Sequence, residues 1–114
     1  MAKMLTFSGP RPLQTALCQA LRDYAEAAYP PGGSECGQVA RAALMDAAVA
    51  LETGFAESGS QAEVSRRLRA HIKAAVTYYC EQHEGALSCA CLERFITGEP
   101  VTEQQFESGC QDSM

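Results

Sequence analysis

Apolar residues recur at intervals of three and four along most of this chain, which is the spacing of helices that have one buried face. The longest such stretch runs from Ser60 to Glu84. Ser60 and Glu63 have the spacing of a capping box at its start, and Gly85 is suited to end it. The pattern therefore predicts one long amphipathic helix whose inner face is formed by Val64, Leu68, Ile72, Ala75, Val76 and Tyr79.

Two further helices are predicted before this one. The first begins at Pro10 and Pro12, because proline is tolerated in the first turn of a helix, and ends at residues 29–33, which hold two prolines and two glycines. The second is capped by Ser34 and runs to about Thr53. The inner face of the first helix is predicted to consist of Leu13, Leu17, Ala20, Leu21, Tyr24 and Ala28.

Shorter helical segments follow. Residues 88–97 have the pattern of a short fourth helix, and Thr102 with Gln105 predicts a capped final turn. We expect residues 1–9 and 108–114 to be flexible ends. No convincing strand is predicted, since residues 4–7 could pair only if a second strand existed.

Together these elements predict one all-α domain over residues 1–114, a compact antiparallel bundle of three main helices plus a short C-terminal helix.

Charge is distributed unevenly over the chain, which has a formal net charge of −5. Residues 1–73 contain seven acidic and eight basic side chains, a net charge of +1, and residues 74–114 contain seven acidic and one basic, a net charge of −6. The acidic C-terminal third argues against nucleic acid as a partner. No segment is long and apolar enough for a membrane span or a signal peptide, so we expect a cytoplasmic protein with no membrane partner.

Residues 39–51 are apolar on nearly every side of the predicted second helix, with many alanines. A small domain cannot bury a helix on all sides, so this pattern favours self-association, and we expect a homodimer. The alternative is that alanine serves only as a good helix former. Leu44, Val49 and Leu51 are the partner-binding residues predicted on this helix.

Basic residues project from the first half of the predicted helix at residues 60–84. Such a run is usually a solvated face. The sharper hypothesis is a docking surface for an acidic partner protein, formed by Arg66, Arg69 and Lys73.

The best candidate for metal-ligand chemistry is the cluster of Cys80, His83, Cys89 and Cys91. Cys80 and His83 lie three positions apart on one helix, and a turn at Gly85 returns the chain toward them. Three thiolates and an imidazole form a recognised tetrahedral zinc set, so the sequence suggests zinc or another soft metal as a possible cofactor. The same cysteines would also fit a helical core, because a free cysteine packs as a small apolar residue.

A redox role is a further alternative for these cysteines, since Cys89 lies near a helix N-terminus, where a thiolate is favoured. In a cytoplasmic protein, however, the six cysteines are expected to be reduced. His71 lies beside the predicted apolar face and is expected to be a core or boundary residue. No nucleophile elbow, phosphate-binding glycine loop or zinc-protease motif is present in the sequence.

These features favour a small non-enzymatic regulatory protein that acts by protein–protein interaction. We expect an inhibitor or anti-activator that sequesters a transcription regulator or an enzyme. The alternative is a metal-binding or metal-sensing protein that uses the four-residue cysteine and histidine cluster.

Overall fold

The computed structural model describes residues 4–83 and 87–107 of the chain, and these residues are mostly helical. They are not all-α as predicted, because two short strands pair in an antiparallel sheet. The radius of gyration of 13.9 Å is close to the ~13 Å expected for a compact 100-residue domain. In chain order the elements are β1 (Met4–Ser8), α1 (Arg11–Ala28), α2 (Glu35–Ser58), β2 (Gln61–Ser65), the 3₁₀ turn η1 (Arg66–Leu68), α3 (Arg69–Gln82), α4 (Leu87–Ile96) and α5 (Glu103–Glu107).

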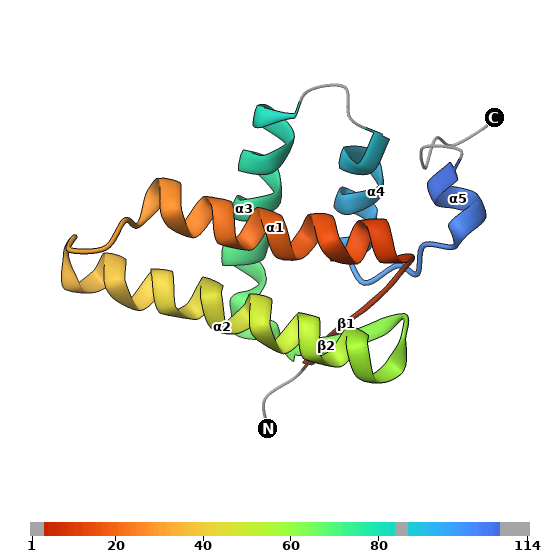
Figure 1. Cartoon of the computed structure of the whole chain (residues 1–114), viewed down its shortest axis with the longest axis horizontal. Helices are drawn as coiled ribbons and strands as arrows, with labels where there is room; N and C mark the ends of the chain where they lie inside the picture. Colours follow the sequence, from red (N-terminus) through yellow and green to blue (C-terminus); the bar gives the residue numbers. More distant parts are fainter. Residues whose placement is uncertain (1–3, 84–86, 108–114) are drawn as a thin grey trace.

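Helices α1 and α2 run side by side in opposite directions, joined by residues 29–34 (Figure 1). The predicted start of α2 is confirmed, because the Ser34 hydroxyl accepts a hydrogen bond from the Gly37 amide at 3.1 Å. The predicted end is wrong. The helix continues past Thr53 to Ser58, and Gly59 caps it with a φ of +90°, a conformation that favours glycine.

Position 54 within α2 requires a glycine, because the strand β2 packs directly against it. A Cβ atom at this position would lie 2.8 Å from the Ala62 Cβ and 3.1 Å from the Ala62 Cα. The glycine that the sequence pattern marks as part of a helix break therefore serves a close contact between a helix and a strand.

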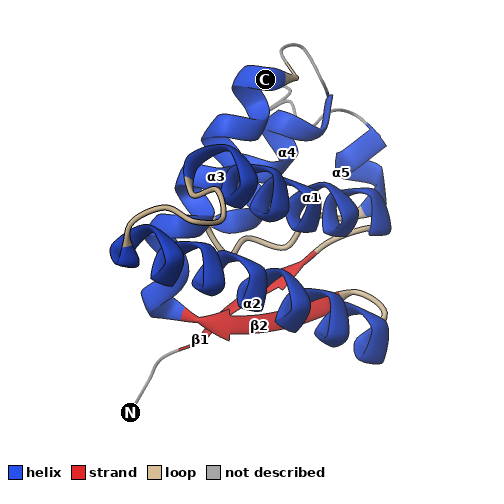
Figure 2. Ribbon diagram, turned by 60° about the vertical axis from the view of Figure 1, so that its left-hand side comes forward, coloured by secondary structure: helices blue, strands red, loops and turns tan. Residues whose placement is uncertain are grey.

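The predicted helix at residues 60–84 is wrong in its first part. Residues 61–65 form β2, which pairs with β1 (Figure 2), and the register places Thr6 opposite Glu63. Ala62 and Val64 are buried while Gln61 and Glu63 are exposed, which is the alternation of a strand with one covered face. The turn η1 then leads into α3, which begins at Arg69.

The capping box predicted at Ser60 does not form, because its residues lie at and within the strand. Instead, the Ser58 hydroxyl accepts hydrogen bonds from the amides of Ser60 and Gln61, at 3.3 and 2.7 Å.

The prediction of a flexible N-terminal segment is also wrong for Met4–Ser8, which form β1 with Phe7 fully buried. Residues 108–114, the other predicted flexible end, lie outside the described residues. The final capped turn is confirmed. The Thr102 amide donates to the Gln105 side chain at 2.9 Å, and the Gln105 amide donates to the Thr102 hydroxyl at 3.0 Å.

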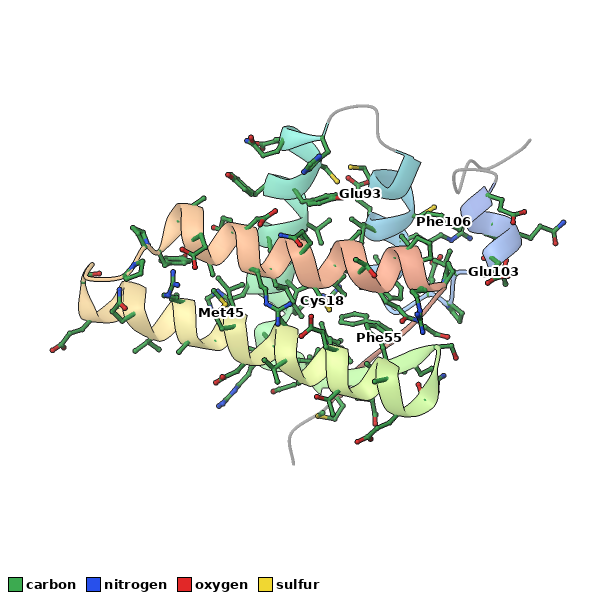
Figure 3. All side chains as sticks on the ribbon, in the orientation of Figure 1. Cys18, Met45, Phe55, Glu93, Glu103 and Phe106 are labelled. Atoms are coloured by element: carbon green, nitrogen blue, oxygen red, sulfur yellow. The ribbon has the colours of Figure 1, made fainter. Side chains whose placement is uncertain are left out.

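The core lies where α1, α2, α3, α4 and the strands meet. The Phe95 ring lies 5.7 Å from that of Phe7 and 6.1 Å from that of Phe55, measured between centroids. Cys18 and Phe55 point into the space between α1 and α2 (Figure 3). Helices α3 and α4 cross the direction of α1 and α2 (Figure 1), so the helices do not share one axis.

Candidate functional site

The four predicted metal ligands do not come together as a tetrahedral set. Cys80 and His83 lie at the end of α3, and Cys89 and Cys91 lie on α4. The His83 ring packs on Tyr79 with centroids 4.3 Å apart, and the Cys89 thiol donates to the His83 carbonyl at 3.8 Å. Within residues 4–83 and 87–107, no group of three or more histidine, cysteine or acidic side chains is placed to hold a metal ion.

The chemical state of the cysteines differs from the prediction as well. Cys91 is fully buried and disulfide-bonded, so the expectation that every cysteine is reduced is wrong. Cys80 and Cys89 are free. Burial, followed by the neighbouring Cys89 thiol and the charge of Glu93, raises the pKa of Cys80 to about 12. A thiol with such a pKa stays protonated near neutral pH, which disfavours nucleophilic attack.

Two of the three predicted contact residues on α2 belong to the core. Leu44 and Leu51 are fully buried within the chain, so neither side chain is available to a partner in this structure. Val49 is 55% exposed. The sequence pattern cannot distinguish the buried Leu44 and Leu51 from the exposed Val49, because both sides of the helix carry apolar side chains. Contact with α1 decides which side is covered.

Val49 belongs to a line of exposed residues along α2, spaced alternately by three and four positions as in a coiled-coil seam. We call this line the outer stripe of α2. Its members are Val39, Ala42, Asp46, Val49 and Thr53. Val39 and Val49 are two of the three large apolar side chains that are exposed among the described residues.

The three predicted basic contact residues are all exposed but lie in different surroundings. Arg66 is on η1, whereas Arg69 and Lys73 are one turn apart on α3. Arg69 and Lys73 line a cavity of about 300 Å³ between β1, α3 and α4, and Arg66 does not. This cavity exists because β2 holds β1 beside α3 and α4, so the predicted continuous helix would not have formed it.

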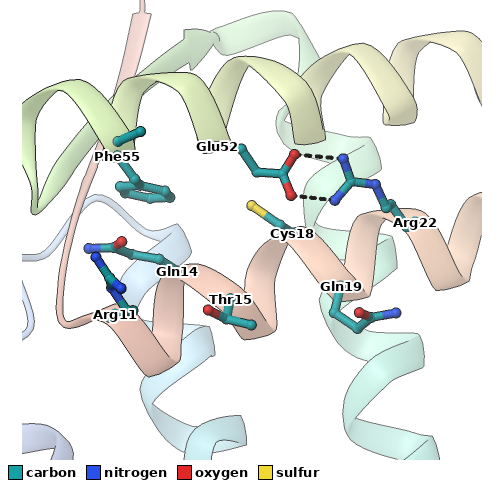
Figure 4. Close-up of a pocket in the computed structure, with 9 residues that line it drawn as sticks. Arg11, Gln14, Thr15, Cys18, Gln19, Arg22, Glu52 and Phe55 are labelled. Carbon is teal, nitrogen blue, oxygen red and sulfur yellow. Dashed lines mark hydrogen bonds and ion pairs between the residues drawn. The ribbon is translucent and has the colours of Figure 1, made fainter.

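A second hollow, of about 310 Å³, lies between α1 and α2 near the ends that face β2 (Figure 4). Arg22 and Glu52 form a two-bond ion pair at one end, with N–O distances of 2.5 and 2.6 Å. This pair lowers the pKa of Glu52 and raises that of Arg22. These two charge-assisted hydrogen bonds link α1 to α2, so the pair serves to join the two helices.

The Cys18 thiol lies beside this ion pair and donates to the Ala48 carbonyl at 3.8 Å. Burial, followed by the charge of Glu52, raises the pKa of Cys18 to about 11, with Arg22 acting in the opposite direction. Cys18 is therefore a neutral packing group at physiological pH.

The chain matches no protein-family model, and comparisons with curated proteins and with solved structures find no significant match. In the described part of the chain, no helix has the length and apolar character to span a membrane.

Sequence reasoning missed the cavity and the ion pair. The available signal for the cavity was the matching alternation of Leu5 and Phe7 with Ala62 and Val64, since each pair is separated by one polar residue. For Arg22 and Glu52 no local signal exists, because they lie thirty positions apart and meet only through the pairing of α1 with α2.

Proposed function

We propose that this protein is a small non-enzymatic regulator that acts by binding another protein, such as an inhibitor or anti-activator that sequesters a transcription regulator or an enzyme. The observation that carries the proposal is the outer stripe of α2, where Val39 and Val49 are 70% and 55% exposed. Their spacing along α2 suits contact with a second helix.

The stripe is suited to a helix–helix contact for energetic reasons. Each Å² of apolar surface removed from water contributes about 25 cal/mol of favourable free energy to such a contact. The small side chain of Ala42 would let a facing helix approach closely, while Asp46 would fix the register of the contact. A homodimer formed through the same stripe is part of the proposal, so a second copy and the partner protein would compete for this surface.

A non-enzymatic role is supported by the thiol chemistry. The raised pKa values of Cys18 and Cys80 make these two cysteines poor nucleophiles. Arg66, exposed on η1, would contribute to docking of an acidic partner protein. We further propose that the protein acts in the cytoplasm. The free thiols of Cys18, Cys36, Cys80 and Cys89 support this compartment, whereas the disulfide of Cys91 is uncommon there.

Affinity capture with matched variants tests the interaction. Tagged wild-type protein, Val49→Glu and Gln104→Glu are used as baits in native lysate at low salt. Val49→Glu places a charge in the stripe, and Gln104→Glu adds the same charge on the exposed surface of α5. We expect wild type and Gln104→Glu to retain the same proteins and Val49→Glu to lose them.

Circular dichroism spectra that agree for all three proteins establish that the fold is intact. Equal capture by Val49→Glu, or capture no greater than that of a tag-only control by the wild type, would contradict the proposed function.

A further inference from the structure

The cavity between β1, α3 and α4 has an apolar floor and a charged rim. The floor is formed by Leu5, Phe7, Ile72, Val76 and Ile96. Phe7, Ile72 and Val76 belong to the buried core, so this part of the floor is held in place by packing. Its volume of about 300 Å³ is at the lower end of small-molecule sites, which suits a small ligand with an apolar tail.

The charged residues that line the cavity are Arg69, Lys73 and Glu93. Together these three side chains carry one net positive charge. Arg69 and Lys73 lie four positions apart on α3, so their side chains extend from the same face of the helix. Each of the ion pairs formed within residues 4–83 and 87–107 involves other residues, so both cations are available to an anion.

We propose that this cavity binds a medium-chain fatty carboxylate, with the tail on the apolar floor and the carboxylate between Arg69 and Lys73. A monoanion matches the net charge of the wall. The Arg69 guanidinium can donate two parallel hydrogen bonds to a carboxylate, and the Lys73 ammonium adds a point charge. Glu93 disfavours ligands that carry more negative charge, such as a phosphate dianion.

This site is separate from the proposed protein-binding surface. None of the residues of the outer stripe of α2 lines the cavity. The ligand is bound by one chain without a partner, so carboxylate binding and protein capture can fail independently.

Isothermal titration calorimetry of the purified protein with decanoate, below its micelle concentration, tests the proposal. We expect saturable binding of one decanoate per chain. The uncharged analogue decanamide has the same tail and should bind about tenfold more weakly or worse, because its neutral amide oxygen cannot form charge-assisted ion pairs with Arg69 and Lys73.

Two double variants separate the cavity cations from basic charge in general. Arg69→Gln with Lys73→Gln should weaken decanoate binding about tenfold or more. Arg66→Gln with Arg67→Gln removes the same charge from exposed residues that do not line the cavity, and should bind decanoate like wild type.

Chemical shift perturbation provides a second readout, since bound decanoate should shift the methyl resonances of Ile72, Val76 and Ile96. The absence of saturable decanoate binding, equal losses in the two double variants, or equal affinity for decanamide would each overturn the proposal. Methyl shifts caused by a blocked glutamate–leucine tetrapeptide but not by decanoate would also overturn it, because they would assign the cavity to an acidic protein segment.

Discussion

At the residue scale, Cys18 shows how burial changes the chemistry of one side chain. Its thiol is 4% exposed and its pKa is raised from 9.0 to about 11, chiefly by burial. In the unfolded chain the same thiol loses its proton near pH 9. Between these two pH values the unfolded state therefore binds fewer protons than the folded state, and stability must fall as pH rises.

We expect the wild type to lose up to ~3 kcal/mol of unfolding free energy through Cys18 as pH rises from about 9 to about 11. Below pH 9 this contribution is fully present. Urea unfolding from about pH 9 to about pH 11 gives the free energy of unfolding of the wild type and of Cys18→Ala. The contribution of Cys18 is the difference between the two slopes of this free energy against pH. Identical slopes would mean that the Cys18 thiol is not protected from ionisation by the fold.

The capping residues could be predicted from sequence, whereas Gly54 could not. Ser34, Thr102 and Gln105 find their hydrogen-bond partners within three positions along the chain, so the sequence contains the whole motif. Gly54 is required by Ala62, which reaches it only after the chain has turned at Gly59. A glycine that serves a tertiary contact has the same local sequence signal as one that ends a helix.

At the scale of elements, β2 is the principal difference between expectation and structure. Five residues with two apolar positions fit a strand and a helical turn almost equally well. The partner strand β1 lies 57 positions earlier at the Thr6–Glu63 pair, beyond the reach of any local pattern. The helical content of α3 and α4 was predictable because their periodic segments contain their own apolar faces.

Ala62 distinguishes the strand from the predicted helix. In a helix it would lie away from the apolar face, but in β2 it is 4% exposed and packs against Gly54. We expect Ala62→Leu to lower the free energy of unfolding by about 1–3 kcal/mol through overpacking. Glu63→Leu, at an exposed neighbouring position, should change it by no more than about 0.5 kcal/mol.

Denaturant unfolding of both variants measures the difference. A neutral Ala62→Leu variant would favour the helical alternative for this segment.

The candidate site was predictable only in part at this scale. The basic side chains at positions 66–73 could be identified from sequence. Which of them lie on η1 and which line the cavity depends on where α3 begins. Likewise, Val49 could not be distinguished from Leu44 and Leu51 until the contact between α1 and α2 was known.

At the scale of the whole molecule, dimerisation through the outer stripe of α2 should link stability to protein concentration. For a dimer that dissociates on unfolding, each tenfold rise in concentration adds about 1.4 kcal/mol per dimer, so we expect the melting temperature of the wild type to rise by several degrees.

The melting temperature of Val49→Glu should not depend on concentration, and that of Gln104→Glu should behave like the wild type. Calorimetric scans at three concentrations measure this dependence. A wild-type melting temperature that is independent of concentration would argue against the dimer.

The antiparallel sheet also has a consequence for how the chain folds during synthesis. Ribosomes add about 5–20 residues per second, so β1 is made roughly 3–11 s before the segment that pairs with it. Throughout this interval the nascent chain carries an unpaired strand with Leu5 and Phe7 uncovered, which is the kind of edge that promotes association between chains. Helices α1 and α2 can pair earlier, so β1 is synthesised before both helices but reaches its final place after them.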